Sequence, residues 1–240
     1  MSRRTTMRRF YTEAAAEPAP DGHAVTLDGR PVRSRATRAP LVVPTHALAA
    51  AIADEWANQG ETVDPAAMPL TTLATTAFDA AIPRREELVE EAVNRAATDA
   101  VCYRTPYPEA LARRQEAHWH PVLDWLALQH DARLNTTTGI RPVAQPPDAL
   151  SALRNALNAY GPLELAAVIG AVRATDSVVL ALALAAGRLG AGDAFDAAEL
   201  EATHEIEQWG LDGEQEARRT AVLDELRAAE RFLQLLQADG

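Results

Sequence analysis

The sequence predicts an α+β fold, in which a small N-terminal β-rich domain (residues 1–82) precedes a larger C-terminal all-helical domain (residues 83–240). Two observations predict this division. Short apolar runs separated by turn residues fill the first 44 residues, whereas apolar residues recur at helical spacing from Pro83 onward. A chain of 240 residues is long enough for two units, each with its own core.

The first part of the chain carries a hairpin signal in "HAVTLDGRPVRS". Asp28-Gly29 lies between short apolar runs, a pattern typical of a type I′ turn. Pro31 has no N–H to donate, so the return strand should lie at a sheet edge or form a bulge. We expect further strands in "RFYTEAAA" and "APLVVP", on either side of this hairpin.

One or two short helices should complete the N-terminal domain. Thr45 is a candidate N-cap for a first helix, which Gly60 should close. A second helix is expected over about residues 71–81, with Thr71 as its cap. The apolar stripe of the first helix consists of Leu48, Ile52 and Trp56.

The C-terminal domain should be helical throughout. The run from Val178 to Ala186 is apolar on every side, which predicts the buried centre of a helical bundle. Asp148, Asp176 and Asp196 are candidate N-caps. Helices are expected near residues 84–101, 108–130, 148–159, 162–174, 177–189, 196–208 and 213–237.

Composition narrows the possible functions. The net charge is −11, which argues against a nucleic-acid or membrane partner, because both need a positive protein surface. All 23 basic residues are arginine, so lysine-dependent chemistry is excluded. A single cysteine cannot form an intramolecular disulfide, and we expect a cytoplasmic protein. For "MSRRTTMRRF" we expect a frayed basic end in preference to a transit peptide.

Candidate enzyme residues each have a simpler structural explanation. His118 and His120 lie two apart, so on a helix they face nearly opposite sides and cannot share a metal. "GRLGAG" is typical of a helix C-terminus, and Cys102 of a small buried apolar residue. The carboxylates after Arg85 suit a solvated helix face: Glu86, Glu87, Glu90 and Glu91. We therefore expect no catalytic residue, cofactor or metal.

Two segments remain, and each places a tryptophan and several acids near a helix end. They are "DEWANQGETVDPAAMPLT", residues 54–71, and "LEATHEIEQWGLDGEQEARR", residues 200–219. An aromatic residue with an acidic rim suits a protein or peptide partner, but a buried tryptophan that anchors a helix end explains each segment equally well. The candidate partner-binding residues are Glu55, Trp56, Asp64, Glu201, Glu205, Trp209, Asp212, Glu214 and Glu216.

Over about residues 8–235 the sequence resembles the assembly chaperones of the α subunit of F-type ATP synthase, a family of mitochondria and α-proteobacteria. The resemblance is carried, in order, by "RRFY", "LDGRPVRS", "PLVVPTHALAAAIADEW", "QGETVDPAAMPLTTLA" and "EIEQWG". It implies a protein that is not an enzyme. Such a protein binds the free α subunit and shields its β-contacting surface until assembly.

The resemblance also implies the same two-domain fold, a monomer when free, and a location in the mitochondrial matrix if the source is eukaryotic. Ala202, Thr203 and His204 occupy positions where the family is richer in glutamate, so which acid binds the partner stays open. Two other functions are possible. One is a small-molecule enzyme with an interdomain pocket formed by Glu116, His118, His120 and Asp124, and the other is a general interaction scaffold.

Overall fold

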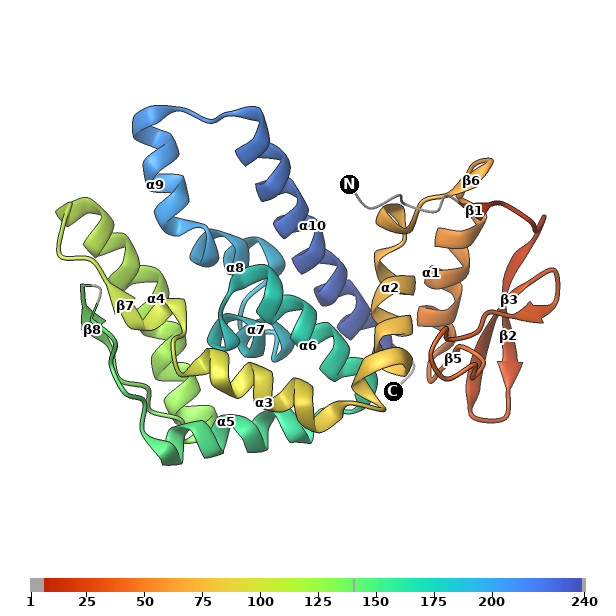
Figure 1. Ribbon diagram of the computed structural model, residues 1–240, viewed down its shortest axis with the longest axis horizontal. Helices are drawn as coiled ribbons and strands as arrows, with labels where there is room; N and C mark the ends of the chain where they lie inside the picture. The colour runs from red at the N-terminus through yellow and green to blue at the C-terminus, as the bar shows by residue number, and fades with distance from the viewer. Residues whose placement is uncertain (1–6, 140, 239–240) are drawn as a thin grey trace. The chain divides into compact units, whose positions relative to one another are not determined.

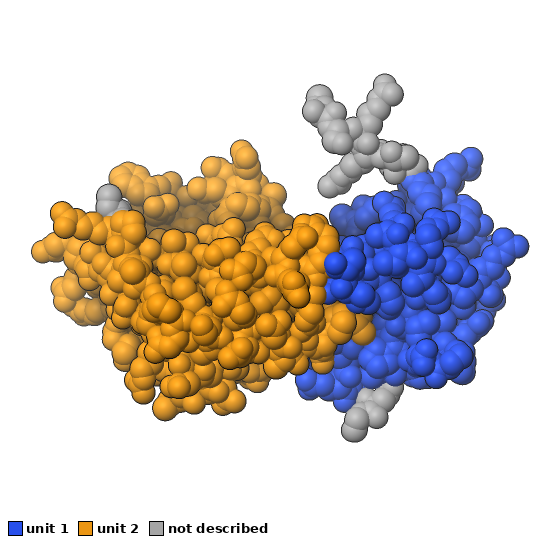
Figure 2. All heavy atoms as spheres, turned by 60° about the horizontal axis from the view of Figure 1, so that its bottom comes forward, with its two compact units in different colours: residues 1–83, 231–240 blue, residues 84–230 orange. Residues whose placement is uncertain are grey.

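The computed structural model describes residues 7–139 and 141–238, so the basic start "MSRRTT" lies outside the described residues. The chain forms two compact units, coloured separately in Figure 2. Unit 1 comprises Met1–Pro83 and Arg231–Gly240, and unit 2 comprises Arg84–Glu230. A small strand-rich N-terminal region and a larger helical region confirm the predicted α+β class (Figure 1).

The sheet of unit 1 is built around one central strand, β3, which pairs antiparallel with β2, β4 and β5. Between β3 and β4, Asp28 and Gly29 both have positive φ, 48° and 72°, so the predicted tight hairpin is confirmed. Pro31 lies at the edge, opposite Thr26. The strands are β2 (Ala14–Ala19), β3 (Gly22–Leu27), β4 (Arg30–Pro31) and β5 (Val42–Val43), with β1 (Met7–Arg8) and β6 (Thr62–Val63) paired separately.

Helix α1 (His46–Ala57) packs on β2 and β3 (Figure 1). The predicted cap is confirmed, because the Thr45 hydroxyl accepts a hydrogen bond from Leu48 N at 3.2 Å. The prediction that Gly60 closes the helix is wrong: α1 ends at Ala57 with Asn58 as its C-cap. The expected apolar stripe is buried, and Trp56 retains 8% of its exposure.

The second helix begins earlier than predicted. It consists of α2 (Pro69–Thr76), preceded by a short 3-10 turn η1 (Pro65–Ala67) and continued by a π-helical segment η2 (Ala77–Ala81). Thr71 is not its cap, because Pro69 already occupies the first helical position, where its missing N–H costs nothing. The free N–H groups of the first turn bond instead to a distant side chain, described below.

Among the described residues of unit 2, the helices are joined by loops that contain a 3-10 turn, η3 (Ala100–Cys102), and a short parallel pair, β7 (Tyr103–Arg104) with β8 (Thr137–Thr138). The single helix expected over residues 196–208 is two helices, because Glu199 leaves helical geometry between them. The helices are α3 (Arg85–Ala96), α4 (Glu109–His130), α5 (Pro147–Ala159), α6 (Pro162–Thr175), α7 (Val178–Ala185), α8 (Ala191–Ala198), α9 (Leu200–Trp209) and α10 (Gly213–Leu236).

Helix α7 forms the centre of unit 2, as its all-round apolar character predicts. It packs against α3, α4, α6 and α8, and its residues from Val178 to Leu184 are buried. None of the three aspartates predicted to be N-caps is one. Asp148 and Asp196 lie inside α5 and α8, and Asp176 takes a left-handed conformation (φ 54°) at the end of α6. Ser177 caps α7 instead.

A fully buried carboxylate completes that cap. Asp99 Oδ2 accepts hydrogen bonds from Val178 N at 2.8 Å and Val179 N at 3.1 Å, and Oδ1 accepts one from Val101 N at 3.3 Å. Burial raises the pKa of Asp99 to about 6, against the lowering effect of the Ser177 hydroxyl and of these backbone donors. The core helix therefore depends on a side chain that lies 79 residues earlier in the chain.

Candidate protein-binding surface

Glu55 holds the corner between α1 and α2. One carboxylate oxygen accepts a hydrogen bond from Leu70 N at 2.7 Å, and the other accepts from Thr71 N at 2.8 Å and Thr71 Oγ1 at 2.7 Å. Burial raises the pKa of Glu55, while the Thr71 and Leu70 hydrogen bonds oppose that rise. Glu55 thus caps α2 in place of a local residue, and its oxygens are engaged within unit 1.

Trp56 packs inside the same corner. Its ring meets Tyr11 edge-on at 5.7 Å between centroids, and Tyr11 OH donates to the Trp56 carbonyl at 2.7 Å. The indole is 8% exposed. Of the two explanations for this tryptophan, the structure matches the helix-anchoring one, because a ring so enclosed presents little surface to a partner.

Asp64 stabilises the loop between the two helices. Its carboxylate accepts a hydrogen bond from Ala66 N at 3.1 Å, which caps η1. The buried Gln59 ties the loop to α1, since its side chain accepts from Asp64 N at 2.7 Å and donates to the Glu55 carbonyl at 3.1 Å. The first predicted segment is therefore a hydrogen-bonded corner whose polar side chains mostly bond to unit 1 itself.

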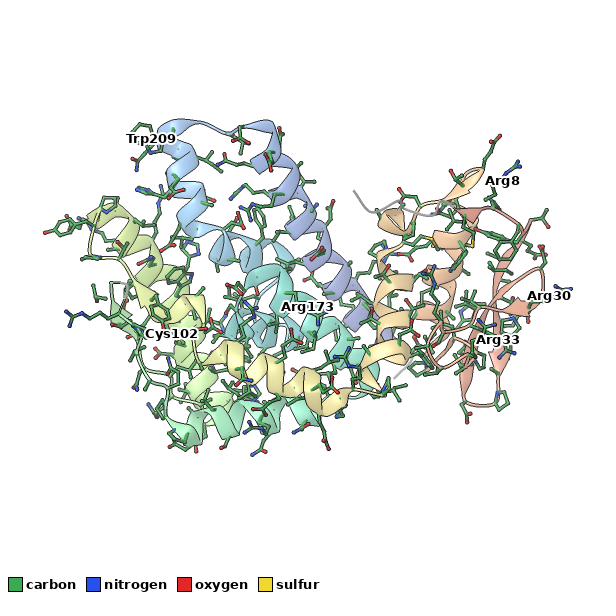
Figure 3. The ribbon with its side chains drawn as sticks, in the orientation of Figure 1. Arg8, Arg30, Arg33, Cys102, Arg173 and Trp209 are labelled. Atoms are coloured by element: carbon green, nitrogen blue, oxygen red, sulfur yellow. The ribbon has the colours of Figure 1, made fainter. Side chains whose placement is uncertain are left out.

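Trp209 has the opposite environment. It ends α9, is 85% exposed, and is followed by Leu211, which is 48% exposed. Figure 3 shows its side chain at the end of α9, directed away from the helix. A large aromatic ring in solvent is unfavourable for an isolated monomer and is typical of a contact that a partner covers.

Tyr107, which sequence analysis missed, lies at the same end of unit 2. Three hydrogen bonds set the register of α4 against the α8–α9 segment: Trp119 Nε1 to Ala197 O at 2.8 Å, Gln115 Nε2 to Glu201 Oε1 at 2.6 Å, and Arg114 to Glu207 at 2.9 Å. Along these three hydrogen bonds the residue numbers on α4 fall while those on α8 and α9 rise, so α4 and α9 run antiparallel.

Because the two helices run antiparallel, the start of α4 and the end of α9 point toward the same end of unit 2. Tyr107, two residues before α4, is 80% exposed. We call Tyr107, Trp209 and Leu211 the aromatic end: they are exposed large side chains that come from two segments far apart in sequence. No local pattern distinguishes Tyr107 from other loop tyrosines, and its position relative to α9 depends on the pairing of α4 with α9.

Gln115 holds the two halves of the aromatic end together. The side chain is fully buried. Its Oε1 accepts a hydrogen bond from Thr105 N at 2.8 Å while its Nε2 donates to Glu201, and its carbonyl accepts from Arg104 at 2.6 Å. One amide therefore links α4, α9 and the loop that carries Tyr107.

A carboxylate–arginine cluster fixes α10 to the α8–α9 junction. Glu199, 7% exposed, accepts two hydrogen bonds from Arg218 at 2.8 and 2.6 Å and one from Arg219 at 2.9 Å. Arg219 also donates to Thr203 Oγ1 at 2.9 Å and covers the ring of Phe195 at 4.9 Å. These contacts position the turn that carries Trp209 and Leu211.

The predicted acids around Trp209 differ in their engagement. Asp212 caps α10 in a reciprocal capping box with Gln215: Gln215 N donates to Asp212 Oδ1 at 2.8 Å. Glu201 accepts from Gln115, as above. The remaining three are exposed and form no ion pair with any described residue: Glu205, Glu214 and Glu216. They supply negative charge near the aromatic end.

Charge is divided unequally between the units. Unit 2 contains 24 acidic residues and 14 arginines, whereas unit 1 contains 10 and 9. Almost the whole net charge of −11 therefore belongs to the helical unit. An aromatic end within such a unit is suited to a partner surface that is apolar and basic.

The residues of the proposed enzyme pocket lie along the outside of α4. His120 lies 3.7 Å from Glu116 and 3.4 Å from Asp124, one helical turn away on either side, and all three are exposed. His118 is also exposed, on a different face. Within residues 7–139 and 141–238 no group of three or more His, Cys, Asp or Glu could hold a metal ion. Cys102 is buried, and burial raises the pKa of its thiol to about 12.

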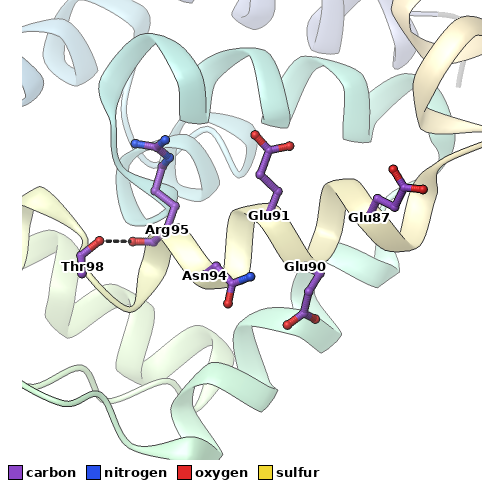
Figure 4. A pocket seen from close by; sticks show the side chains of 6 residues that line it. All are labelled: Glu87, Glu90, Glu91, Asn94, Arg95 and Thr98. Atoms are coloured by element: carbon purple, nitrogen blue, oxygen red, sulfur yellow. Dashed lines mark hydrogen bonds between the residues drawn. The ribbon is translucent and has the colours of Figure 1, made fainter.

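The acidic face of α3 borders a depression of about 610 Å³. Figure 4 shows that Glu90 and Asn94 point to one side of the helix while Glu91 and Arg95 point to the other. Glu90 pairs with Arg154 at 2.7 Å and Glu91 with Arg173 at 3.6 Å. The carboxylates do not converge on a common point, which fits the solvated face that the sequence predicts.

In the part of the chain that the structure describes, no helix is long and apolar enough to cross a membrane.

Comparison with known proteins identifies clear relatives. The model of a family described as ATP12 chaperone protein matches residues 8–127. The crystal structure of Atp12 from Paracoccus denitrificans is 37% identical, with a TM-score of 0.88 over 95% of this chain and 98% of that one. A point mutant of the same Paracoccus protein matches equally well, with a TM-score of 0.88 and 37% identity. Atu1473 from Agrobacterium tumefaciens, described as a candidate chaperone, is 36% identical with a TM-score of 0.89 over 96% and 87% of the two chains.

Proposed function

Because the chain belongs to the ATP12 chaperone family, we propose that it acts in ATP synthase assembly by binding the free α subunit of the catalytic head. On this proposal it shields the β-contacting surface of that subunit until β arrives. An unassembled subunit exposes a large apolar face that aggregates unless it is covered. A placeholder of this kind works by binding and transforms no substrate.

The observation that carries the proposal is the exposure of Trp209, 85%, at the aromatic end of a strongly acidic unit. Aromatic residues dominate binding energy when a partner covers them, and surrounding charge speeds encounter. A stable interface covers roughly 800 Å² on each partner, so the aromatic end would be the centre of a wider contact. Glu205, Glu214 and Glu216 would form part of its rim.

The corner residues contribute differently on this proposal. Glu55, Trp56 and Asp64 bond within unit 1, so we assign them to the stability of the protein and not to direct contact. Their substitution should lower the free energy of unfolding, and it should not remove a direct contact with the partner.

Binding of purified α subunit to the chain, measured by size exclusion and by light scattering of the α subunit alone, tests the proposal. Trp209→Ala should weaken binding at least about tenfold, as expected for a central aromatic anchor. Leu128→Ala is the matched control, because Leu128 is 83% exposed on α4 but is not part of the aromatic end. Added β subunit should displace the chain.

Two results would defeat the proposed contact with the α subunit. One is the absence of any complex between the wild-type chain and the α subunit. The other is an equal loss of affinity in Trp209→Ala and Leu128→Ala, which would remove the aromatic end as the contact. Binding of the α subunit that β cannot displace would leave a partner but refute the placeholder role.

A further inference from the structure

Unit 1 carries a loop of exposed arginines that the proposed function does not use. We propose that this loop, residues 30–38, is a docking site for an acidic segment of a polypeptide partner. It holds four arginines, and the sequence from Gly29 to Ala53 contains no acidic residue. The four are Arg30, Arg33, Arg35 and Arg38, all exposed.

These side chains form no ion pair with any described residue, although the chain has an excess of acids. Arg33 donates one hydrogen bond, to the Arg38 carbonyl at 2.9 Å. The nearest acid in sequence, Asp28, accepts hydrogen bonds from Glu13 and Thr12, which lower its pKa; the charge of Arg30 adds to this lowering, but the two side chains form no ion pair. Figure 3 shows Arg30 at the edge of the strands away from α1. Their guanidinium groups are therefore available to an external anion.

The loop is held in shape by a buried polar cluster. Ser34 is fully buried, its hydroxyl donates to Asp79, and it accepts hydrogen bonds from Thr37 N at 3.0 Å and Thr37 Oγ1 at 2.8 Å. The same Asp79 oxygen accepts from Ala36 N at 3.2 Å. Loop arginines mounted on such a base lose less freedom on binding than those of a mobile loop.

Two unusual backbone features serve this arrangement. Asp79 lies in the π-helical segment η2, a geometry that is rare in proteins and concentrated at functional sites. Arg38 has a φ of 61°, a left-handed conformation that costs a non-glycine residue about 1 kcal/mol or more. Both shape the loop that displays the arginines: Asp79 accepts hydrogen bonds from Ser34 and Ala36, and Arg38 lies in the turn that the Arg33–Pro40 bridge closes.

The surroundings of the loop favour an acidic polypeptide over a nucleic acid or an anionic membrane. Guanidinium groups pair with carboxylates through two parallel hydrogen bonds. Residues 30–40 include no aromatic side chain on which a base could stack, and no large apolar side chain that could insert into a bilayer. A net charge of −11 also opposes a long polyanion, whereas a short acidic segment meets mainly the local positive charge. This inference does not rest on the identity of the client bound at the aromatic end.

Fluorescence anisotropy with a labelled (Glu-Gly)4 peptide tests the inference on the full chain. The wild type should bind it more tightly than (Gln-Gly)4, with affinity that falls as salt rises. Arg30→Gln/Arg35→Gln should weaken binding about fivefold, from two exposed charge pairs. Neither side chain donates a hydrogen bond or forms an ion pair within the described residues, and a urea titration would verify that the variant remains folded.

The matched control is Arg133→Gln/Arg188→Gln, which removes the same charge from two exposed arginines of unit 2 that also lack ion pairs with described residues. It should change peptide affinity less than about twofold. Arg30→Glu/Arg35→Glu should abolish binding. Three results would each overturn the inference. The first is equal weakening by both double Gln variants, and the second is no preference for the acidic peptide. The third is loop-dependent binding of inorganic phosphate or phosphatidylserine vesicles without binding of the peptide.

Discussion

The cap that Glu55 provides to α2 gives a prediction whose size follows from the structure. Glu55→Ala removes the acceptor of three hydrogen bonds and leaves the N–H groups of Leu70 and Thr71 unpaired. These two residues are 4% and 7% exposed, so water replaces the carboxylate poorly. Loss of a cap costs about 1 kcal/mol, and each buried donor left unpaired costs about 1–3 kcal/mol. We expect the free energy of unfolding to fall by about 3 kcal/mol.

Urea denaturation followed by circular dichroism and tryptophan fluorescence measures this loss. Asp54→Ala is the control, since Asp54 is an exposed neighbour on the same helix, and its substitution should change stability by less than about 0.5 kcal/mol. Thr71→Ala should cost about 1 kcal/mol in the wild type and close to nothing in Glu55→Ala, because the two side chains share one interaction. If Glu55→Ala and Asp54→Ala were equally stable, the remote cap would contribute nothing and the reasoning would fail.

Three further predictions concern buried groups. For Asp99 the folded pKa of about 6 exceeds the unfolded value of 3.8, so the folded state binds more protons between them. The free energy of unfolding of the wild type should therefore fall relative to that of Asp99→Asn as pH rises from about 4 to about 6, by up to about 3 kcal/mol. Urea titrations at each pH measure both values. The same pH dependence in the two proteins would contradict this prediction. Cys102 should react with a thiol reagent only when urea unfolds the chain, because it is buried with a pKa raised to about 12. Trp56→Ala should lower stability by about 3–5 kcal/mol, whereas Trp209→Ala should leave the urea midpoint unchanged, and the reverse order would exchange their assigned roles.

Local chemistry was sufficient to predict several elements. A type I′ turn requires two consecutive residues with positive φ, which Asp-Gly tolerates, and the structure has them at Asp28 and Gly29. Thr45 caps α1 because its hydroxyl reaches an N–H three residues later. The run from Val178 is apolar on all sides and is buried. Each of these rests on residues within a few positions of one another.

Contacts between distant residues were not predictable in this way. Asp176 fails as a cap because it adopts the left-handed conformation that ends α6, which leaves Ser177 to cap the next helix. The two tryptophans show the same limit within the candidate site. Trp56 and Trp209 both lie near a helix end among acids, yet one is 8% and the other 85% exposed. Trp56 packs against Tyr11, which lies 45 residues earlier in the chain, whereas Trp209 ends α9 in solvent.

The last turn of α10 has a consequence for biosynthesis. The Thr45 hydroxyl that caps α1 also donates to the Leu235 carbonyl at 2.7 Å, and residues from Arg231 onward belong to unit 1. A ribosome delivers Leu235 190 residues after Thr45. The nascent N-terminal unit must therefore wait, incomplete, until Leu235 has left the exit tunnel, and a stop codon placed shortly before Arg231 would leave it without this contact.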